Sequence, residues 1–177
     1  MSKEDFNKII GLIILLVFIT LIKRWFDYSY AIVWLGAIVG YYLPFIDHLF
    51  YAFIVRPDQE VSRNIRSLFS VRKAKQLVAY VKETQTQRDR LIIHTAYFQA
   101  VFMLLTFYIL SSSGSLFGRG LVYGFSLRLL IEQLFEFMEF QSIGRWFTGL
   151  PIQMDLHRTK VFLYANGFLL FIFSMML

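Results

Sequence analysis

Five long apolar stretches, separated by polar or basic segments, dominate the hydrophobic pattern of this chain. They cover residues 8–26, 28–55, 91–110, 121–140 and 161–177. A helix that crosses a bilayer needs about 20 mostly apolar residues, and each stretch meets or approaches that length. A soluble protein of 177 residues has no interior large enough to bury them all. The pattern therefore predicts one all-α domain over residues 1–177, a polytopic integral membrane protein with about five transmembrane helices.

The segment 56–90 has a different pattern, in which apolar residues recur at helical spacing between basic ones. The apolar positions are Val61, Ile65, Leu68, Phe69, Ala74, Leu77, Val78 and Val81. This pattern predicts one or two amphipathic helices on the cytoplasmic surface of the membrane. Membrane lipids are the expected partners, with anionic head groups contributing about 1 kcal/mol per basic residue. Basic inner loops are common in membrane proteins, so we favour that simple interpretation over a dedicated partner site, and we predict no nucleic-acid binding.

Composition and charge agree with membrane insertion and add an orientation. Hydrophobic residues make up 57% of the chain and charged residues 17%, against about 25% charged in soluble proteins. If the five stretches alternate in direction, most basic residues fall on the side of the N-terminus, and the opposite side holds only Lys23, Arg24 and Arg119. Positive charge marks the cytoplasmic side, which predicts a multi-pass inner-membrane protein with a cytoplasmic N-terminus. The absence of cysteine excludes disulfides and thiolate metal sites.

Ionisable side chains interrupt three of the predicted spans, where each costs several kcal/mol unless it is paired or hydrated. They are Asp47, His48, His94, Arg128, Glu132, Glu136 and Glu139. Measured from the inner ends of their spans, Asp47 and Glu132 lie about 12 Å deep and His94 about 5 Å deep. Pro44 should bend or break its span just before Asp47. This polar layer predicts a divalent metal site, with Zn or Mn as candidates, because imidazole and carboxylate groups are their usual ligands.

A purely structural interpretation of the same residues is also open. Arg128 and Glu132 are four residues apart on one helix face, so they could pair and only fix helix packing. A lone His94 near the interface is more often a hydrogen-bonded packing residue than a ligand. The clustering of several such groups at one depth is what favours a functional site.

Three motifs carry a resemblance to a known family. Residues 43–48 read LPFIDH, residues 89–95 read DRLIIHT, and Gly124, Arg128 and Glu132 follow at four-residue steps. In this order they resemble the Leu-Pro-Asp-Xaa-Asp-His, His-Arg-Gly-Xaa-Thr-His-Ser and Gly-Xaa₃-His-Xaa₃-Asp motifs of the YdjM-like family, bacterial inner-membrane proteins described as metal-dependent hydrolases. The chain departs from them at Phe45, Asp89 and Arg128, where the family has Asp, His and His. A guanidinium has no lone pair for a metal, so Arg128 is not a ligand.

The resemblance implies a membrane-embedded, hydrolase-like protein or a degenerate relative of one. Its metal ligands would be Asp47, His48, His94 and Glu132, with Asp89, Asp155 and His157 as further candidates. The metal would lower the pKa of a bound water and so generate the nucleophile. Glu136 would be the general base, and Arg128 would hold the negative group of an amphipathic substrate.

Two other functions remain open on the sequence. Buried Asp, Glu and His residues also form relays, which favours a small transporter or a proton or ion pathway. The basic inner segment is also compatible with a non-catalytic membrane adaptor that binds a partner or anionic lipid. The pattern leaves open whether residues 28–55 cross the bilayer fully or re-enter near Pro44.

Overall fold

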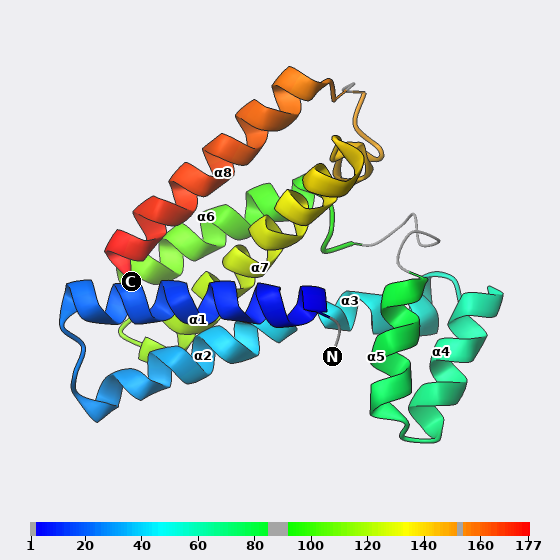
Figure 1. Cartoon of the computed structure of the whole chain (residues 1–177), viewed down its shortest axis with the longest axis horizontal. Helices are drawn as coiled ribbons and strands as arrows, with labels where there is room; N and C mark the ends of the chain where they lie inside the picture. Colours follow the sequence, from blue (N-terminus) through cyan, green and yellow to red (C-terminus); the bar gives the residue numbers. More distant parts are fainter. Residues whose placement is uncertain (1–2, 85–91, 152–153) are drawn as a thin grey trace.

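The computed structural model of the chain describes residues 3–84, 92–151 and 154–177, and every regular element in these ranges is helical. Figure 1 shows a bundle of helices, with a separate helical hairpin at its side. The bundle consists of α1 (Lys3–Lys23), α2 (Ala31–Tyr42), α6 (Ala96–Ser112), α7 (Leu116–Phe140) and α8 (Leu156–Met176). The shorter elements are η1 (Tyr28–Tyr30), α3 (Phe45–Phe50), η2 (Tyr51–Val55), α4 (Glu60–Ser70), α5 (Ala74–Glu83) and η4 (Gly144–Phe147). The predicted all-α class is confirmed.

The closest helix contact joins α2 and α7, which run parallel. Each helix contributes two glycines four residues apart, and each glycine faces a backbone carbonyl of the other helix: Gly36 faces Phe117, Gly40 faces Leu121, Gly120 faces Val33 and Gly124 faces Ala37. A Cβ atom added to any of the four would collide with that carbonyl oxygen. Small residues at this spacing let two helix backbones approach closely, as in helix pairs of membrane proteins. The hydrophobic pattern of the sequence did not predict this contact.

The helix that follows residue 28 is broken at Pro44, as predicted. α2 ends at Tyr42, and α3 begins with Phe45 directly after the proline. Proline has no N–H to donate and its ring clashes with the preceding turn, so the regular hydrogen-bond ladder stops there. The break places Asp47 in the first turn of α3, where its side chain is buried.

Buried amides and hydroxyls connect α6, α7 and α8. Gln99 of α6 and Gln133 of α7 exchange hydrogen bonds, with Gln133 Nε2 donating to Gln99 Oε1 over 2.5 Å. Asn166 of α8 donates to Gln133 Oε1 over 3.4 Å. The hydroxyls of Thr106 and Ser126 lie 3.2 Å apart across α6 and α7. These contacts pair residue 99 with 133 and residue 106 with 126, so α6 and α7 are antiparallel.

The basic segment forms two amphipathic helices, α4 and α5, arranged as a hairpin (Figure 1). Ile65 of α4 packs with Leu77 and Val81 of α5 and with Ala52 of η2, and all four are buried. The two apolar faces therefore cover each other in part, instead of both lying fully open to a leaflet. Phe69, Val71 and Val78 remain exposed on the hairpin.

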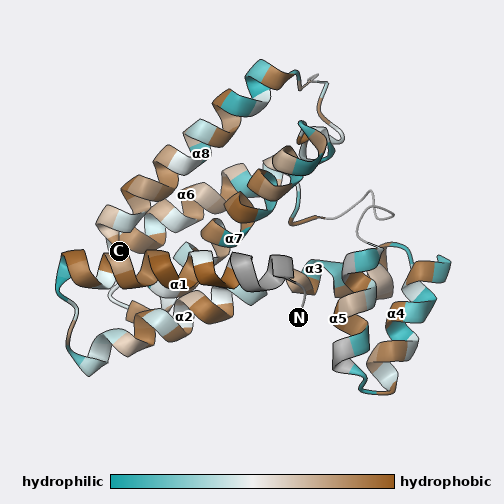
Figure 2. Ribbon diagram, in the orientation of Figure 1, coloured by the Kyte–Doolittle hydropathy of each residue, from teal (hydrophilic) through white to brown (hydrophobic). Residues whose placement is uncertain are grey.

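In the part of the chain that the structure describes, two helical stretches are long and apolar enough to cross a membrane, namely Tyr28–Val55 and Leu156–Met176. Ile9–Lys23 and Ala96–Ser112 are shorter apolar helices. α7 has 25 residues but carries several charges. Figure 2 shows that hydrophobic residues dominate α1, α2 and α8, whereas polar residues are frequent on α4 and α5. Many large apolar side chains on the bundle are exposed, among them Leu104 at 72% and Phe168 at 65%.

At the glycines of the α2–α7 contact, we expect alanine to destabilise the protein, which is the opposite of its usual effect in a helix. Gly→Ala in an open helix position stabilises by about 0.5–1 kcal/mol, because alanine loses less backbone entropy on folding. Gly124→Ala should instead destabilise by about 1–3 kcal/mol, since its methyl group collides with Ala37 O. Unfolding by SDS in mixed micelles measures the difference. Gly11→Ala, where an added Cβ meets open space, is the matched control, and equal effects at both positions would contradict the close contact.

Candidate functional site

Asp47 joins the start of α3 to the segment that leads into α6. Its side chain is almost completely buried, with the residue 2% exposed. Asp47 Oδ1 accepts a hydrogen bond from the backbone N–H of Ile92 over 3.1 Å, and Oδ2 accepts one from Ile93 over 2.8 Å. Two backbone donors thus fix the orientation of this carboxylate independently of its side-chain contacts.

His94 lies between two carboxylates. Its Nδ1 is 2.9 Å from Asp47 Oδ2, and its Nε2 is 2.7 Å from Glu132 Oε2. A hydrogen bond at each of these short contacts needs one proton between the two atoms. With both carboxylates ionised, His94 is therefore an imidazolium that donates from both ring nitrogens.

Arg128 extends the cluster from His94 and Glu132 to α2. Its Nη2 lies 2.5 Å from Glu132 Oε1, one helical turn further along α7. Its Nη1 donates to Tyr41 Oη over 3.2 Å, and the guanidinium lies 5.0 Å from the centroid of the Tyr41 ring. Asp47 and Glu132 supply two negative charges, while Arg128 and protonated His94 supply two positive ones. The buried set is then neutral, which is the arrangement that a low-dielectric interior tolerates.

Aromatic rings enclose His94. The ring of His48 stacks on it at a centroid distance of 5.4 Å, and the ring of Trp146 lies at the same distance, tilted by 58°. Trp146 Nε1 in turn donates to Glu136 Oε2 over 3.0 Å, and Arg145 Nη2 donates to the same oxygen over 2.7 Å. Glu136 thereby holds the η4 segment against α7.

The structure brings five of the predicted site residues together and separates others from them. The five are Asp47, His48, His94, Arg128 and Glu132. Glu136 lies one turn beyond Glu132, and its Oε2 accepts hydrogen bonds from Arg145 and Trp146. It therefore does not face the cluster as a general base would. Asp155 and His157 are exposed, and Asp155 caps α8 by accepting from the N–H of Arg158. Asp89 lies outside the described residues.

The donor set does not fit a divalent metal ion in this arrangement. Within residues 3–84, 92–151 and 154–177, no group of three or more His, Asp or Glu side chains is placed to hold one. Both oxygens of Asp47 accept hydrogen bonds, and Glu132 Oε1 is paired with Arg128. His94 Nδ1 contacts Asp47 Oδ2 and His94 Nε2 contacts Glu132 Oε2, so each ring nitrogen already faces one carboxylate, whereas a catalytic zinc site has three protein ligands around one ion. We therefore derive no chemical step through a metal.

Sequence reasoning missed the partners that complete the cluster, in particular Tyr41 and Trp146. One signal was available for Tyr41. Gly120, Gly124, Arg128 and Glu132 follow at four-residue steps, so they share the α7 face that contacts α2. No comparable pattern indicated Trp146, which lies in η4, the short 3-10 helix after α7.

Comparison with known proteins adds no relative. No protein-family model, no curated protein and no solved structure matches this chain. The site therefore has to be interpreted from its own geometry.

We expect Asp47→Asn to destabilise the protein by about 3 kcal/mol, measured as the free energy of unfolding in SDS mixed micelles. The N–H groups of Ile92 and Ile93 and Nδ1 of His94 all contact the two oxygens of Asp47. An asparagine would place an NH₂ group where one of these oxygens was, so that a donor would face another donor. The substitution also leaves the remaining charges of the cluster unbalanced. Asp27→Asn is the control, because Asp27 accepts only from Ser29 N–H in an exposed turn, where Asn serves equally well. Equal effects of the two substitutions would contradict a central role for Asp47.

Proposed function

We propose that this chain is a multi-pass inner-membrane protein with five spans, which carries a divergent, hydrolase-like acid–base centre in the cytoplasmic half of the bilayer. The centre consists of Asp47, His94, Glu132 and Arg128. The proposal has two parts, the membrane topology and the chemistry, and each is supported by different contacts.

The directions of the helices support five crossings. α2 is parallel to α7, and α6 is antiparallel to it. Lys23 Nζ donates to Met175 O over 2.8 Å, so the last turns of α1 and α8 lie at the same end of the bundle. Successive long helices thus alternate in direction, as consecutive spans must. The exposed apolar side chains on the bundle would be costly in water and are suited to contact with lipid.

The charges support a cytoplasmic N-terminus. The end of the bundle that holds the last turn of α1 and the first turn of α7 carries Lys23, Arg24 and Arg119. The α4–α5 hairpin lies beyond α3 and carries Arg63, Arg66, Arg72 and other basic residues of the segment 56–90. An excess of basic residues on the hairpin side supports our assignment of that side as cytoplasmic, where anionic lipid head groups would meet it.

Because the chain has no cysteine, single cysteine variants give a clean test of this topology. Gly114→Cys, in the exposed turn between α6 and α7, should react with a membrane-impermeant maleimide in intact cells. Ser70→Cys, at the exposed end of α4, should react only after the cells are permeabilised. Reaction of both positions in intact cells, or the reverse pattern, would overturn the proposed orientation.

One observation carries the chemical part of the proposal. The three segments whose motifs resemble the YdjM-like hydrolases are far apart in the chain, yet Asp47, His94 and Glu132, one from each segment, are in direct contact. Simple helix packing does not require these particular residues to converge.

The contacts of Glu132 define what the centre can do. Its carboxylate is bracketed by two cationic donors, His94 Nε2–H and Arg128 Nη2–H, so the same two donors can hold the anionic group of a substrate. A phosphate ester that took this place would leave the Glu132 carboxylate beside it, able to remove a proton from an attacking water. His94 Nε2 would then donate a proton to the leaving oxygen, while Asp47 keeps the imidazole oriented. The Arg128 side chain is 22% exposed, which gives a substrate access.

This assignment changes the role expected for Glu136. Because its Oε2 accepts from Arg145 and Trp146, we assign Glu136 to positioning Trp146 against His94. The base is Glu132. The depth of the centre suits an amphipathic substrate whose charged group reaches the inner leaflet.

We expect the purified protein to release phosphate from a short-chain phosphatidate in detergent micelles. Glu132→Gln should lower kcat by about 100-fold or more, because the base is lost. Arg128→Lys should mainly raise KM, since a lysine has one nitrogen in place of the two with which Arg128 could contact Tyr41 and the substrate phosphate together. Glu139→Gln, the same change at an exposed position of α7, should leave both parameters unchanged. No phosphate release by the wild type, or equal rates for Glu132→Gln and Glu139→Gln, would overturn the chemical proposal and leave the topology untouched.

A further inference from the structure

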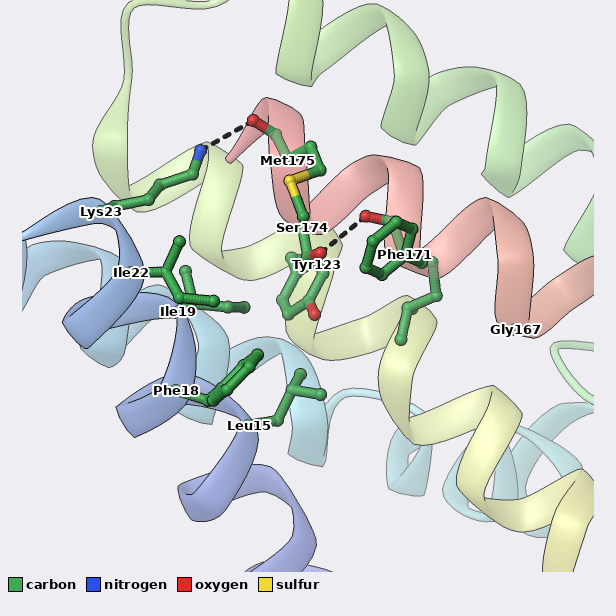
Figure 3. A pocket seen from close by; sticks show the side chains of 11 residues that line it. Leu15, Phe18, Ile19, Ile22, Lys23, Tyr123, Gly167, Phe171, Ser174 and Met175 are labelled. Carbon is green, nitrogen blue, oxygen red and sulfur yellow. Dashed lines mark hydrogen bonds between the residues drawn. The ribbon is translucent and has the colours of Figure 1, made fainter.

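An apolar groove lies between α1, α7 and α8, at the end of the bundle away from the acid–base centre. It has a volume of about 170 Å³. Its walls include Leu15, Phe18 and Ile19 of α1 and Leu170 and Phe171 of α8. Figure 3 shows the α1 and α8 side chains on opposite sides, with Tyr123 of α7 at the back and Lys23 at one end.

The hydroxyl of Tyr123 is the unusual feature of this groove. Tyr123 is 0% exposed, and within the described part of the chain its Oη has no hydrogen-bond partner. A buried polar group without a partner costs about 1–3 kcal/mol. Tyr123 is one of the residues that line the groove, so a ligand seated against this residue can provide the missing partner of its hydroxyl.

The end of the groove is positively charged. Lys23 Nζ donates one of its three hydrogens to Met175 O and lies 5.4 Å from the centroid of the Trp25 ring, and its ammonium can also donate to a ligand. Arg119, one helical turn before Tyr123 on α7, lies close enough for its charge to act on Lys23. A ligand therefore meets cations first, a hydroxyl donor one turn further in, and hydrocarbon side chains beyond that.

We infer that this groove binds one acyl chain of an anionic glycerophospholipid. The phosphate contacts Lys23, the ester carbonyl accepts a hydrogen bond from Tyr123 Oη, and the chain passes Ile19, Phe18 and Leu15. Lys23 and Leu15 are eight residues apart, which is about 12 Å along α1. The volume equals that of about six water molecules at ~30 Å³ each, so the groove holds the first part of one chain and no more. A groove this narrow suits a single acyl chain better than a helix of a second protein.

The inference is independent of the acid–base centre and shares only the bilayer placement with the proposed function. In the proposed orientation the groove opens toward the outer leaflet, opposite to the catalytic half. A lipid here would fill the gap between α1 and α8, and it would act as part of the structure rather than as a substrate.

The test is native mass spectrometry of the full chain released from detergent micelles, with phosphatidylglycerol as the probe. We expect one phosphatidylglycerol to remain bound at least tenfold more tightly than phosphatidylcholine with the same acyl chains. Gly167→Leu should abolish this binding, because Gly167 lines the groove and an added side chain there meets open space. Gly11→Leu places the same side chain at another open position of the bundle and should change nothing.

A second comparison isolates the hydroxyl. Tyr123→Phe should weaken binding of the ester-linked lipid several-fold but leave binding of an ether-linked phosphatidylglycerol, which has no carbonyl, unchanged. Lys23→Gln should reduce the preference for the anionic head group.

Equal binding of both head groups, or equal behaviour of Gly167→Leu and Gly11→Leu, would overturn the inference. A dimer that only Gly167→Leu disrupts would also overturn it, by identifying a second copy as the occupant. Glu132→Gln should bind the lipid normally, which separates a failure of this inference from a failure of the proposed chemistry.

Discussion

The close approach of α2 and α7 is the contact on which the rest of the structure depends. Four glycines allow the two backbones to touch, and the register of that contact fixes the positions of the later side chains on both helices. On α7 the same face continues to Arg128, which reaches Tyr41 just beyond the glycines of α2. A larger spacing between the helices would separate these two side chains and leave Arg128 without its contact to α2.

The break at Pro44 and the hydrogen bonds of Asp47 then turn this contact between two helices into a site built from three segments. α3 carries Asp47 to the backbone amides of Ile92 and Ile93, and His94 connects this carboxylate to Glu132 on α7. Each member of the cluster is oriented by a group outside its own helix. The glutamine pair between α6 and α7 works in the same way further along the bundle, where neutral amides replace the charges.

The sequence predicted most of the helices and the membership of the polar cluster, because apolar length and depth along a helix can be counted. Asp47, His94 and Glu132 were grouped by depth and by the three motifs that resemble the YdjM-like family. Depth does not give the direction in which a side chain points, and this is why Glu136 was assigned to the centre although it faces Trp146 and Arg145. The rotation of α7 could have been inferred from the four-residue steps that begin at Gly120. The position of Trp146 could not be predicted, because it depends on the path of the chain between α7 and the short helix η4, which no local sequence pattern determines.

The order of the segments along the chain also has a consequence for biosynthesis. Asp47 and the glycine face of α2 leave the ribosome well before their partners: residues 92–94 follow more than 40 residues later, and α7 follows more than 70 residues later. In the interval, α2 and α3 carry an uncompensated carboxylate and an open backbone surface. The nascent chain therefore remains an incomplete assembly until the last residues of α7 emerge, and any factor that retains early helices near the site of insertion would act on it during this interval.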